Sequence, residues 1–491
     1  MRILEGLHFG WATETFGAAK LGDSRRSLRL VKLGARAAMN PNGKISDTFS
    51  IPAEQQGAYD FLENKHVQLS PIIAAVGAST VARCSRQQKV YSIIDGSSLG
   101  LVDGLGGKGF GSVGALVKGG VGLKVISSIA VAQDGTPIGL LDQQWWCRTK
   151  AKRRNKKQKR AENVKRSVKD KETQHWLDCM SETQNRADAM NVRLCFLLDR
   201  EADNKDMLLH LSRTGHQFIV RSSWDRNVES KDGHKHLREL LREEPVYGSY
   251  WLDVASGPKR QGRSSHMVVR YSAVVLRLKE KNSGRISKMP VWAVWAREHG
   301  TTPKGEKPLD WLLFTNEPVL RMEDARNVVL GYTRRWRIEE FHKTWKSGEC
   351  NVEQTQLRSS KAVMIWATVL ATVALRTERL KQLSRSEPEL PADSELTRYE
   401  LLALLLLKRE IKKQNETITD DVPPLSLAVR WIAEIGGYTG KSSGGPPGSI
   451  TIRRGLERVL LVALALESYD KSSPSSTDDK NLKPKARGIS K

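Results

Sequence analysis

The chain has 491 residues, which is too long for one ordinary domain and long enough for two to four. Its 80 Lys and Arg residues outnumber its 55 Asp and Glu residues, so the formal net charge is +25. An excess this large favours a polyanionic partner, although charge alone does not separate DNA from RNA or from an anionic membrane. The five cysteines are widely spaced, which argues against a zinc ribbon or a disulfide framework and favours a reducing, cytoplasmic setting.

Nothing in the sequence predicts a membrane protein. The N-terminal segment MRILEGLHFGWATETFG has neither a long apolar core nor a small-residue cleavage site, so it is not expected to be a signal peptide. The longest apolar stretches, Val363–Leu375 and Val459–Leu466, are too short to span a bilayer. We therefore expect a soluble protein without a membrane partner.

Residues 1–68 are predicted to form a helical domain that binds DNA. Asp23 is a candidate N-cap for the helix in LGDSRRSLRLVKLGARAAM. A basic stripe about 60° wide runs along this helix, formed by Arg25, Arg29, Lys32 and Arg36. An apolar face is expected beside it, formed by Leu28, Val31 and Ala35. Such a stripe is as typical of a solvated helix as of a DNA contact, and the overall charge favours DNA. The candidate contacts are Arg25, Arg26 and Arg29.

Residues 69–365 are predicted to form an α/β catalytic domain. KVYSIIDGSSLGLV indicates a strand with Asp95 at the end of its apolar run, and Val192–Leu198 is a short buried strand that leads to Asp199. Two further strands are expected to meet at a turn at Asp134 and Gly135. Residues from about 214 to 320 are rich in strand patterns and are interpreted as a β-rich insertion.

The remaining segments are predicted mainly as helices. Residues 321–348 are expected to form one long helix with acidic residues in its first turn and Gly348 at its end. Residues 366–468 are predicted to form a helical C-terminal domain, and 469–491 a disordered tail. The segment from Arg148 to Lys171 has 13 Lys or Arg and 2 Asp or Glu, a net charge of 13 − 2 = +11. It could hold phosphates without reading bases, or it could be a solubilising run.

Three carboxylates stand out as candidate metal ligands: Asp95, Asp199 and Glu339. Hydrolysis of a phosphodiester needs an activated oxygen nucleophile and neutralised charge, which divalent ions held by clustered carboxylates provide. Each carboxylate is a weak signal by itself, because an Asp at the end of a strand is commonly a turn residue. Glu339 could equally be a solvated helix residue, and its neighbour Glu340 is an alternative.

The phase of the predicted helix favours Glu339. Relative to Tyr332, a helix places Arg335, Glu339 and Lys346 within a sector about 60° wide, whereas Glu340 lies about 80° away on the other side. One face would then carry a hydroxyl, two cations and one carboxylate. A salt-bridged surface helix with an Arg335–Glu339 pair is the alternative explanation.

These residues carry a family resemblance. YTRRWRIEEFHKTWKSG resembles the Tyr-Arg-Glu-Lys signature of bacterial DDE transposases of the insertion-sequence-four group. Further segments resemble the family in the same order along most of the chain: LGDSRRSLRLVKL, GAYDFLENKHV, IIDGSSL, LLDREAD, QQWW, FIVRS, PLDWLLFTNEPV and WIAEIGGYTG.

The resemblance implies an RNase H-like catalytic core that carries the β-rich insertion, flanked by helical N-terminal and C-terminal domains. It implies that Asp95, Asp199 and Glu339 bind Mg²⁺, with Mn²⁺ able to substitute. It further implies a set of DNA-binding residues: Tyr332, Arg335, Lys346, Trp311, which would stack on a flipped base, and Arg221. The implied reaction is cut-and-paste transposition through a DNA hairpin. The implied assembly is a homodimer that holds inverted-repeat ends and target DNA, with residues 366–468 as its dimerisation domain. The implied location is the bacterial cytoplasm, associated with the nucleoid.

Two departures from the family and two rival functions stay open. Asp60 stands where relatives often have Arg, which puts one N-terminal DNA contact in doubt, and the basic run from Arg148 to Lys171 is denser than the resemblance leads us to expect. The chain could instead be an RNase H-like nuclease or resolvase that does not join strands. It could also be a catalytically silent DNA-binding inhibitor, although the intact triad argues against this.

Overall fold

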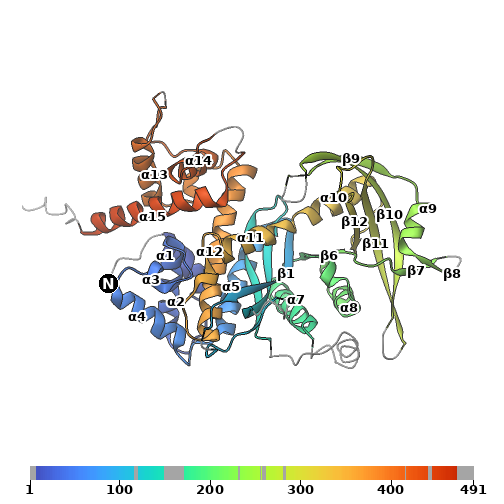
Figure 1. Cartoon of the computed structure of the whole chain (residues 1–491), viewed down its shortest axis with the longest axis horizontal. Coiled ribbons are helices and arrows are strands. Elements are labelled where there is room, and N and C mark those ends of the chain that lie inside the picture. Colours follow the sequence, from blue (N-terminus) through green and yellow to red (C-terminus); the bar gives the residue numbers. More distant parts are fainter. Residues whose placement is uncertain are drawn as a thin grey trace, which may run out of the picture. The chain divides into compact units, whose positions relative to one another are not determined.

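The computed structural model divides the chain into two compact units, one of residues 8–386 and one that contains residues 387–491 (Figure 1). The residues that the structure describes are 7–104, 106–114, 120–148, 171–230, 233–254, 256, 261–279, 284–414, 416–440 and 445–472. The basic run from Arg148 to Lys171, which could hold phosphates or be a solubilising run, therefore lies outside the described residues apart from its two end residues.

The N-terminal part of the larger unit is helical, as predicted. Its helices are α1 (Leu7–Phe16), α2 (Ser24–Met39), α3 (Ile45–Thr48), α4 (Pro52–Glu63) and α5 (Leu69–Cys84). The predicted cap of α2 is confirmed, because the backbone N–H of Arg25 donates to Asp23 Oδ1 at 2.9 Å. The predicted apolar face is wrong at Leu28, which is 48% exposed. The buried face of α2 centres near Gly34, about 120° around the helix from Leu28.

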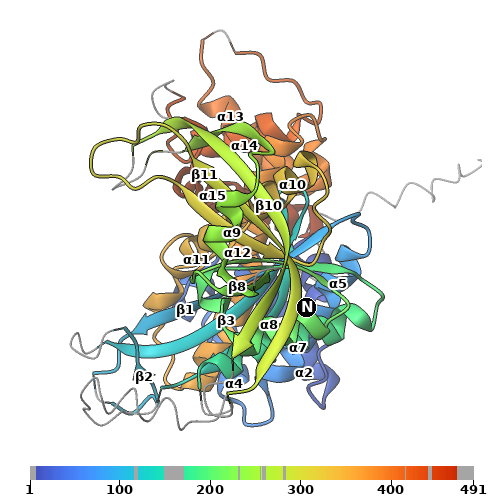
Figure 2. The same ribbon diagram turned by 90° about the vertical axis from the view of Figure 1, so that its right-hand side faces the viewer.

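One mixed sheet of twelve strands, among the described residues, runs through the larger unit (Figures 1 and 2). The strand order is β2-β3-β1-β5-β6-β12-β11-β10-β7-β8, with β4 beside β3 and β9 beside β10. The strands are β1 (Val90–Leu101), β2 (Gly111–Ser112), β3 (Val121–Ala132), β4 (Pro137–Trp146), β5 (Leu194–Leu198), β6 (Gln217–Arg221), β7 (Asn227–Ser230), β8 (Gly233–His236), β9 (Gly248–Val254), β10 (Arg263–Lys279), β11 (Ile286–Glu298) and β12 (Asp310–Thr315).

The first half of the sheet forms the core expected around the two aspartates. Strand β3 pairs antiparallel with β1 on one side and with β4 on the other. The chain turns from β3 to β4 at Asp134 and Gly135, as predicted. Strands β5 and β6 then join in parallel, β5 beside β1 and β6 beside β5. The predicted start of the insertion at 214 differs from the structure, because β6 belongs to this parallel set. The remaining strands continue the same sheet from β12, which pairs antiparallel with β6.

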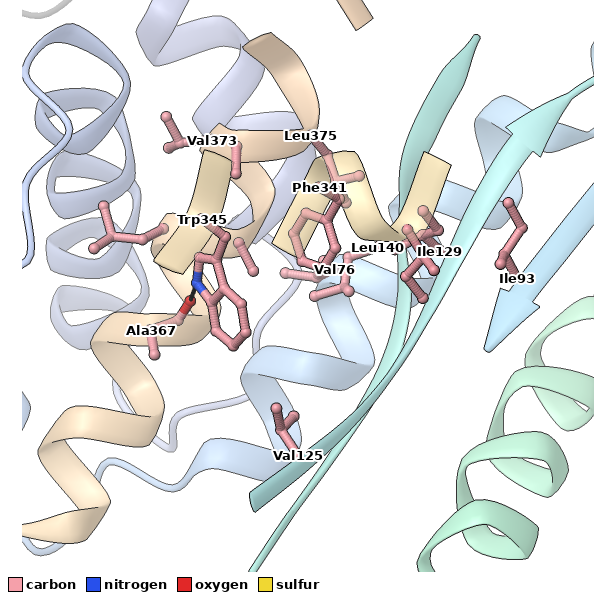
Figure 3. Packing of buried hydrophobic residues seen from close by; sticks show 14 of the residues in the cluster. Val76, Ile93, Val125, Ile129, Leu140, Phe341, Trp345, Ala367, Val373 and Leu375 are labelled. Carbon is pink, nitrogen blue, oxygen red and sulfur yellow. Dashed lines mark hydrogen bonds between the residues drawn. The ribbon is translucent and has the colours of Figure 1, made fainter. Parts of the chain in front are cut away.

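Apolar residues on the two faces of the sheet form two clusters. Alternate positions of β1 divide between them, with Ile93 in one cluster and Ile94 in the other. The first cluster includes residues of α11 (Trp336–Lys346) and α12 (Ser360–Ser386), and the second includes residues of α7 (Thr173–Asp188) and α8 (Lys205–Arg213). Figure 3 shows the first, where Trp345 points toward α12 and its indole N–H donates to the carbonyl oxygen of Ala367 at 2.8 Å.

The single helix predicted for residues 321–348 is wrong. The segment forms α10 (Met322–Thr333) and α11, which are separated at Arg334 and Arg335. Hydrogen bonds from the N–H of Arg334 to Gly331 O and from that of Arg335 to Tyr332 O reach back three residues and tighten the last turn. Gly331 permits a close approach here, because a Cβ atom would lie 2.9 Å from the hydroxyl oxygen of Tyr91.

The predicted domain boundary at 365/366 falls inside a continuous helix. Helix α12 is buried along most of its length, and Trp366 is fully buried in the first apolar cluster. The structure therefore divides the chain at Ser386, after this core helix ends. Helix α12 is long and apolar enough to cross a membrane by composition, but 78% of its most apolar window is buried within the protein, as in the core helix of a globular fold.

The smaller unit is helical, as predicted for the C-terminal region. It contains η5 (Ala392–Ser394), α13 (Arg398–Glu410), α14 (Leu425–Ile435) and α15 (Ser449–Ser472). Thr397 and Glu400 form a capping box that begins α13, and the ammonium group of buried Lys408 pairs with Glu416 and Glu434 at 2.7 and 2.8 Å. Helix α15 includes residues 469–472, where the predicted tail begins, and residues 473–491 lie outside the described part of the chain.

A buried ion pair in the insertion predicts an acid-sensitive element. Glu298, whose side chain is 3% exposed, accepts from Arg263 Nε at 2.7 Å, from Ser265 Oγ at 2.8 Å and from the N–H of Leu309 at 2.8 Å. The Arg263 guanidinium outweighs burial and lowers the pKa of Glu298 from 4.5 to about 2. Because the pKa is lower in the folded protein, the ionised Glu298 stabilises the fold fully above the pKa of the unfolded chain, about 4.5. This stabilisation is lost as the pH falls from about 4.5 toward 2.

We expect Glu298→Gln to lower the free energy of unfolding at pH 7 by about 1.5–3 kcal/mol, because buried Arg263 then keeps only one of its two carboxylate partners, Glu306. Between pH 4.5 and 2 the variant should lose less stability than the parent. Urea unfolding at several pH values measures both effects. Equal pH dependence in the two proteins would contradict the assignment.

Candidate active site

Strand pairing brings Asp95 and Asp199 side by side. In the parallel pair β1–β5, the last partners are Ile93 and Leu197, so both aspartates lie two residues beyond the same pair. Asp95 was predicted at the end of a strand, which is wrong, because β1 continues to Leu101 on its other partner β3. Its position is special for a different reason: it is where β1 and β5 part. Because side chains alternate along a strand, both aspartates share the face of Ile93 and Leu197, which belong to the cluster that includes α11.

The environment of Asp95 opposes a negative charge. Burial raises the pKa of Asp95 to about 6, and the neighbouring carboxylate of Asp199 adds to the rise. The Arg335 guanidinium and a 2.7 Å hydrogen bond from the N–H of Gly96 to Asp95 Oδ1 act in the opposite direction. Two acidic groups close enough to perturb each other in a half-buried position are the electrostatic arrangement that a bound cation would relieve.

Asp199 lies where β5 ends, as predicted. It caps the short helix η3 (Arg200–Ala202), because the N–H of Glu201 donates to Asp199 Oδ1 at 2.8 Å. One oxygen of the Asp199 carboxylate therefore accepts a hydrogen bond from the backbone. This bond fixes the orientation of the side chain, while the carboxylate remains next to Asp95.

Arg335 connects Asp95 to Glu339. Its Nη1 lies 3.3 Å from Asp95 Oδ2, and its Nη2 forms an ion pair with Glu339 Oε1. Glu340 pairs instead with Arg337 at 2.6 Å. The choice of Glu339 over Glu340 is thus consistent with the structure, since both Arg335 and Glu339 lie at the start of α11. Tyr332 lies on α10, so the predicted angle between Tyr332 and Glu339 on a single helix does not hold across the break between α10 and α11.

The donor set fits a hard divalent cation by its chemistry. Carboxylate oxygens are the ligands that Mg²⁺ and similar ions prefer, and the guanidinium of Arg335 shows that Asp95 and Glu339 can share one positive group. Among the described residues, however, no three His, Cys, Asp or Glu side chains converge closely enough to be recognised as a ready-made ion site. Arg335 must therefore release at least one carboxylate before both can bind the same ion.

Tyr332, Arg221 and Trp311 form a neighbouring group. The rings of Trp311 and Tyr332 lie edge to face with centroids 6.2 Å apart. Burial raises the pKa of Tyr332, although the charges of Arg335 and Arg221 lower it. Burial lowers the pKa of Arg221, whose Nη2 donates to the carbonyl oxygen of Asp310 at 3.1 Å. The structure therefore brings these three predicted DNA-binding residues together beside Arg335.

The predicted contacts on α2 are placed elsewhere. Arg25 pairs with Asp23, Arg26 donates to the carbonyl oxygen of Leu21 at 2.9 Å, and Arg29 lies beside Gly57 of α4. In the described part of the chain, no hydrogen bond or ion pair joins them to Asp95, Asp199 or Glu339. They form a separate basic region of the larger unit.

Glu353 is a site residue that the sequence did not indicate. Its Oε1 accepts the N–H of Gly100 on β1 at 2.8 Å and lies 3.4 Å from Lys346 Nζ on α11. Glu353 belongs to the short helix η4 (Val352–Gln354), which follows a left-handed turn at Asn351. No motif or periodicity marks it, because its importance comes from a contact with residues about 250 positions earlier.

We expect Glu353→Ala to reduce DNA cleavage about tenfold, as loss of a group that orients a site residue commonly does. Lys346 would lose the carboxylate that holds its ammonium group. Rates of strand nicking should be measured for the variants of Glu353, of Lys346, and of both. If Glu353 acts through Lys346, the double variant is no slower than Lys346→Ala alone; full additivity would contradict this role.

Two known protein families match separate parts of the chain. Residues 8–67 match the family model described as transposase DNA-binding, and residues 140–376 match that described as transposase DDE domain. The second range includes Asp199 and Glu339, whereas Asp95 precedes it. The chain therefore contains a DNA-binding domain and a catalytic domain of transposases, and it is a DDE transposase. Such a domain belongs to an enzyme that uses divalent metal ions to cut DNA and to transfer strands. The prediction of DNA as a partner is confirmed.

Proposed function

We propose that this DDE transposase belongs to the insertion-sequence-four group, resembles the transposase of transposon Tn-five, and moves DNA by cut-and-paste transposition. An RNase H-like core is supported by the strand sequence, in which three antiparallel strands, β1, β3 and β4, are followed by the parallel strands β5 and β6. The observation that carries the proposal is the juxtaposition of Asp95 and Asp199 at the parting of β1 and β5, with Glu339 joined to Asp95 through Arg335.

Asp95, Asp199 and Glu339 are the proposed ligands of Mg²⁺, for which Mn²⁺ can substitute. When bound, the ion activates an oxygen nucleophile and neutralises charge at the scissile phosphate. Arg335 exchanges its contact with the carboxylates for a DNA phosphate, which removes the guanidinium from the ligand positions. Lys346 and Tyr332 hold further phosphates, Arg221 adds a positive charge beside them, and Trp311 stacks on a flipped base.

The proposed reaction uses one site for successive in-line displacements at phosphorus. Water first cleaves one strand at the transposon end and leaves a 3′-OH. This hydroxyl attacks the opposite strand to form a hairpin, water opens the hairpin, and the same 3′-OH finally attacks target DNA. The proposed assembly is a homodimer on two inverted-repeat ends, with the C-terminal helices as interface, in the cytoplasm and associated with the nucleoid.

Strand transfer is the decisive test. A pre-nicked duplex made from the DNA that flanks the gene is incubated with a supercoiled plasmid, the full chain and Mg²⁺. We expect joined products with the parent and none with Asp95→Asn, with binding of the duplex retained. Cleavage without joining would favour a nuclease or resolvase. Equal behaviour of Asp95→Asn and the parent in every Mg²⁺-dependent assay would refute the enzymatic site.

A further inference from the structure

A large aromatic side chain stands exposed at the edge of the sheet where the catalytic aspartates lie. Trp224 follows the end of β6 by three residues, and 66% of its surface is exposed. Strands β5 and β6 are parallel, so their carboxyl ends meet at one edge, the edge at which Asp199 follows β5. Single exposed apolar side chains are common on protein surfaces, so a role for Trp224 has to follow from its support and its neighbours.

The loop that carries Trp224 is held rigidly by a buried carboxylate. Asp203 has a fully buried side chain, and its Oδ2 accepts from Ser222 Oγ at 3.0 Å, from the N–H of Ser223 at 2.7 Å and from the N–H of Trp224 at 3.2 Å. Its Oδ1 accepts from Arg226 Nε at 2.8 Å. Four donors from five consecutive residues thus converge on one side chain, and they fix the backbone on both sides of the exposed indole.

The same loop is tied to the residue that follows Asp199. Ser223 Oγ donates to the carbonyl oxygen of Arg200 at 2.7 Å, which links the neighbour of Trp224 to the neighbour of the proposed metal ligand. Arg200 is exposed, and its charge acts on Arg221 at the end of β6. The backbone of Trp224 is therefore held one residue from the contact with Arg200 and three residues after Arg221, at the edge that carries Asp199.

Cations hold phosphates, and an exposed indole offers a flat surface on which an unpaired base can stack. A fully paired duplex presents no free base face to such a surface, whereas DNA opened near a cleavage position does. We propose that Trp224 stacks on an unpaired base of the DNA strand bound beside Asp199, as a stacking position additional to Trp311. This inference rests on the proposed function, because it takes the carboxylate edge as the place where DNA is cut.

The test compares two DNA molecules of the same mixed sequence. One is a fully paired duplex, and the other lacks about four nucleotides in one strand and has 2-aminopurine in the unpaired stretch of the opposite strand. Binding is measured by fluorescence anisotropy with the full chain at fixed salt and without metal. We expect Trp224→Ala to weaken binding of the gapped duplex about tenfold, the size expected from losing one stacked base, and to leave the paired duplex within about twofold. Trp224→Phe should restore most of the affinity and the quenching of 2-aminopurine.

Trp251→Ala is the matched control, because Trp251 is 70% exposed but lies on β9 in the insertion. Its variant should bind both molecules like the parent. The inference is overturned if Trp224→Ala binds the gapped duplex like the parent, if it loses both molecules equally, or if Trp251→Ala shows the same loss. If the parent cuts and joins DNA and Trp224→Ala binds the gapped duplex as tightly as the parent, this inference alone is overturned. A parent that neither binds nor cuts DNA would overturn both proposals.

Discussion

Glu339→Gln is expected to reduce Mg²⁺-dependent DNA cleavage about 1000-fold or more, whereas Glu340→Gln should remain within about threefold of the parent. The two glutamates are adjacent on α11 and lose the same charge. Only Glu339 shares Arg335 with Asp95, while Glu340 pairs with Arg337. A metal ion contributes several kcal/mol to charge stabilisation in the transition state, and each 1.36 kcal/mol changes the rate about tenfold, which sets the expected loss.

The comparison separates chemistry from folding. The Glu339 side chain is half exposed, so its ion pair with Arg335 contributes little to stability, and both variants should unfold within about 1 kcal/mol of the parent. Single-turnover nicking of an end duplex measures the rate, and urea unfolding checks the fold. Equal rates for the two variants, or a loss confined to Glu340→Gln, would mean that Arg335 marks the wrong carboxylate.

The sequence predicted the parts of this site but not all of their geometry. The apolar runs before Asp95 and Asp199 predicted two strands, because buried strands need apolar side chains on both faces. Their register could not be read from these runs, since it depends on pairing between segments about 100 residues apart. That register is what places the two aspartates two residues beyond Ile93 and Leu197.

Other features were missed because their cause is tertiary. The break between α10 and α11 occurs at two arginines, without a proline or glycine between the helices, so helical periodicity continued through it. Gly331, which approaches Tyr91, and Gly135, which packs against Arg334 and Arg337, lack side chains where this packing is close, but neither lies between the two helices. Glu353 lies in no pattern that marks a site, and its contact with the backbone of Gly100 joins segments far apart in the sequence. Asp203 ends the segment LLDREAD, but its contacts with the loop after β6 depend on the fold and not on that pattern.

Trp345→Ala is expected to lower the free energy of unfolding of the larger unit by about 3–5 kcal/mol, the usual cost of removing a buried tryptophan side chain. Trp345 is fully buried on α11, and its ring stacks on that of Phe341 with centroids 5.6 Å apart (Figure 3). It also meets the ring of Trp145 edge to face, with centroids 5.8 Å apart. The substitution would leave a cavity and remove the hydrogen bond to Ala367 O.

The consequence should extend to catalysis, because Trp345 anchors the helix that carries Glu339 and Lys346. A Trp345→Phe variant keeps one aromatic ring of the apolar contact but loses the N–H donor and part of the indole's volume, so it should be intermediate in stability. Trp336→Ala on the same helix is the control: that ring is half exposed, and its removal should cost less than about 1 kcal/mol. Urea unfolding orders the three variants, and a Trp345→Ala protein as stable as Trp336→Ala would show that α11 is not held through this side chain. The position of the third carboxylate would then depend mainly on Arg335 rather than on the packing of α11 against α12.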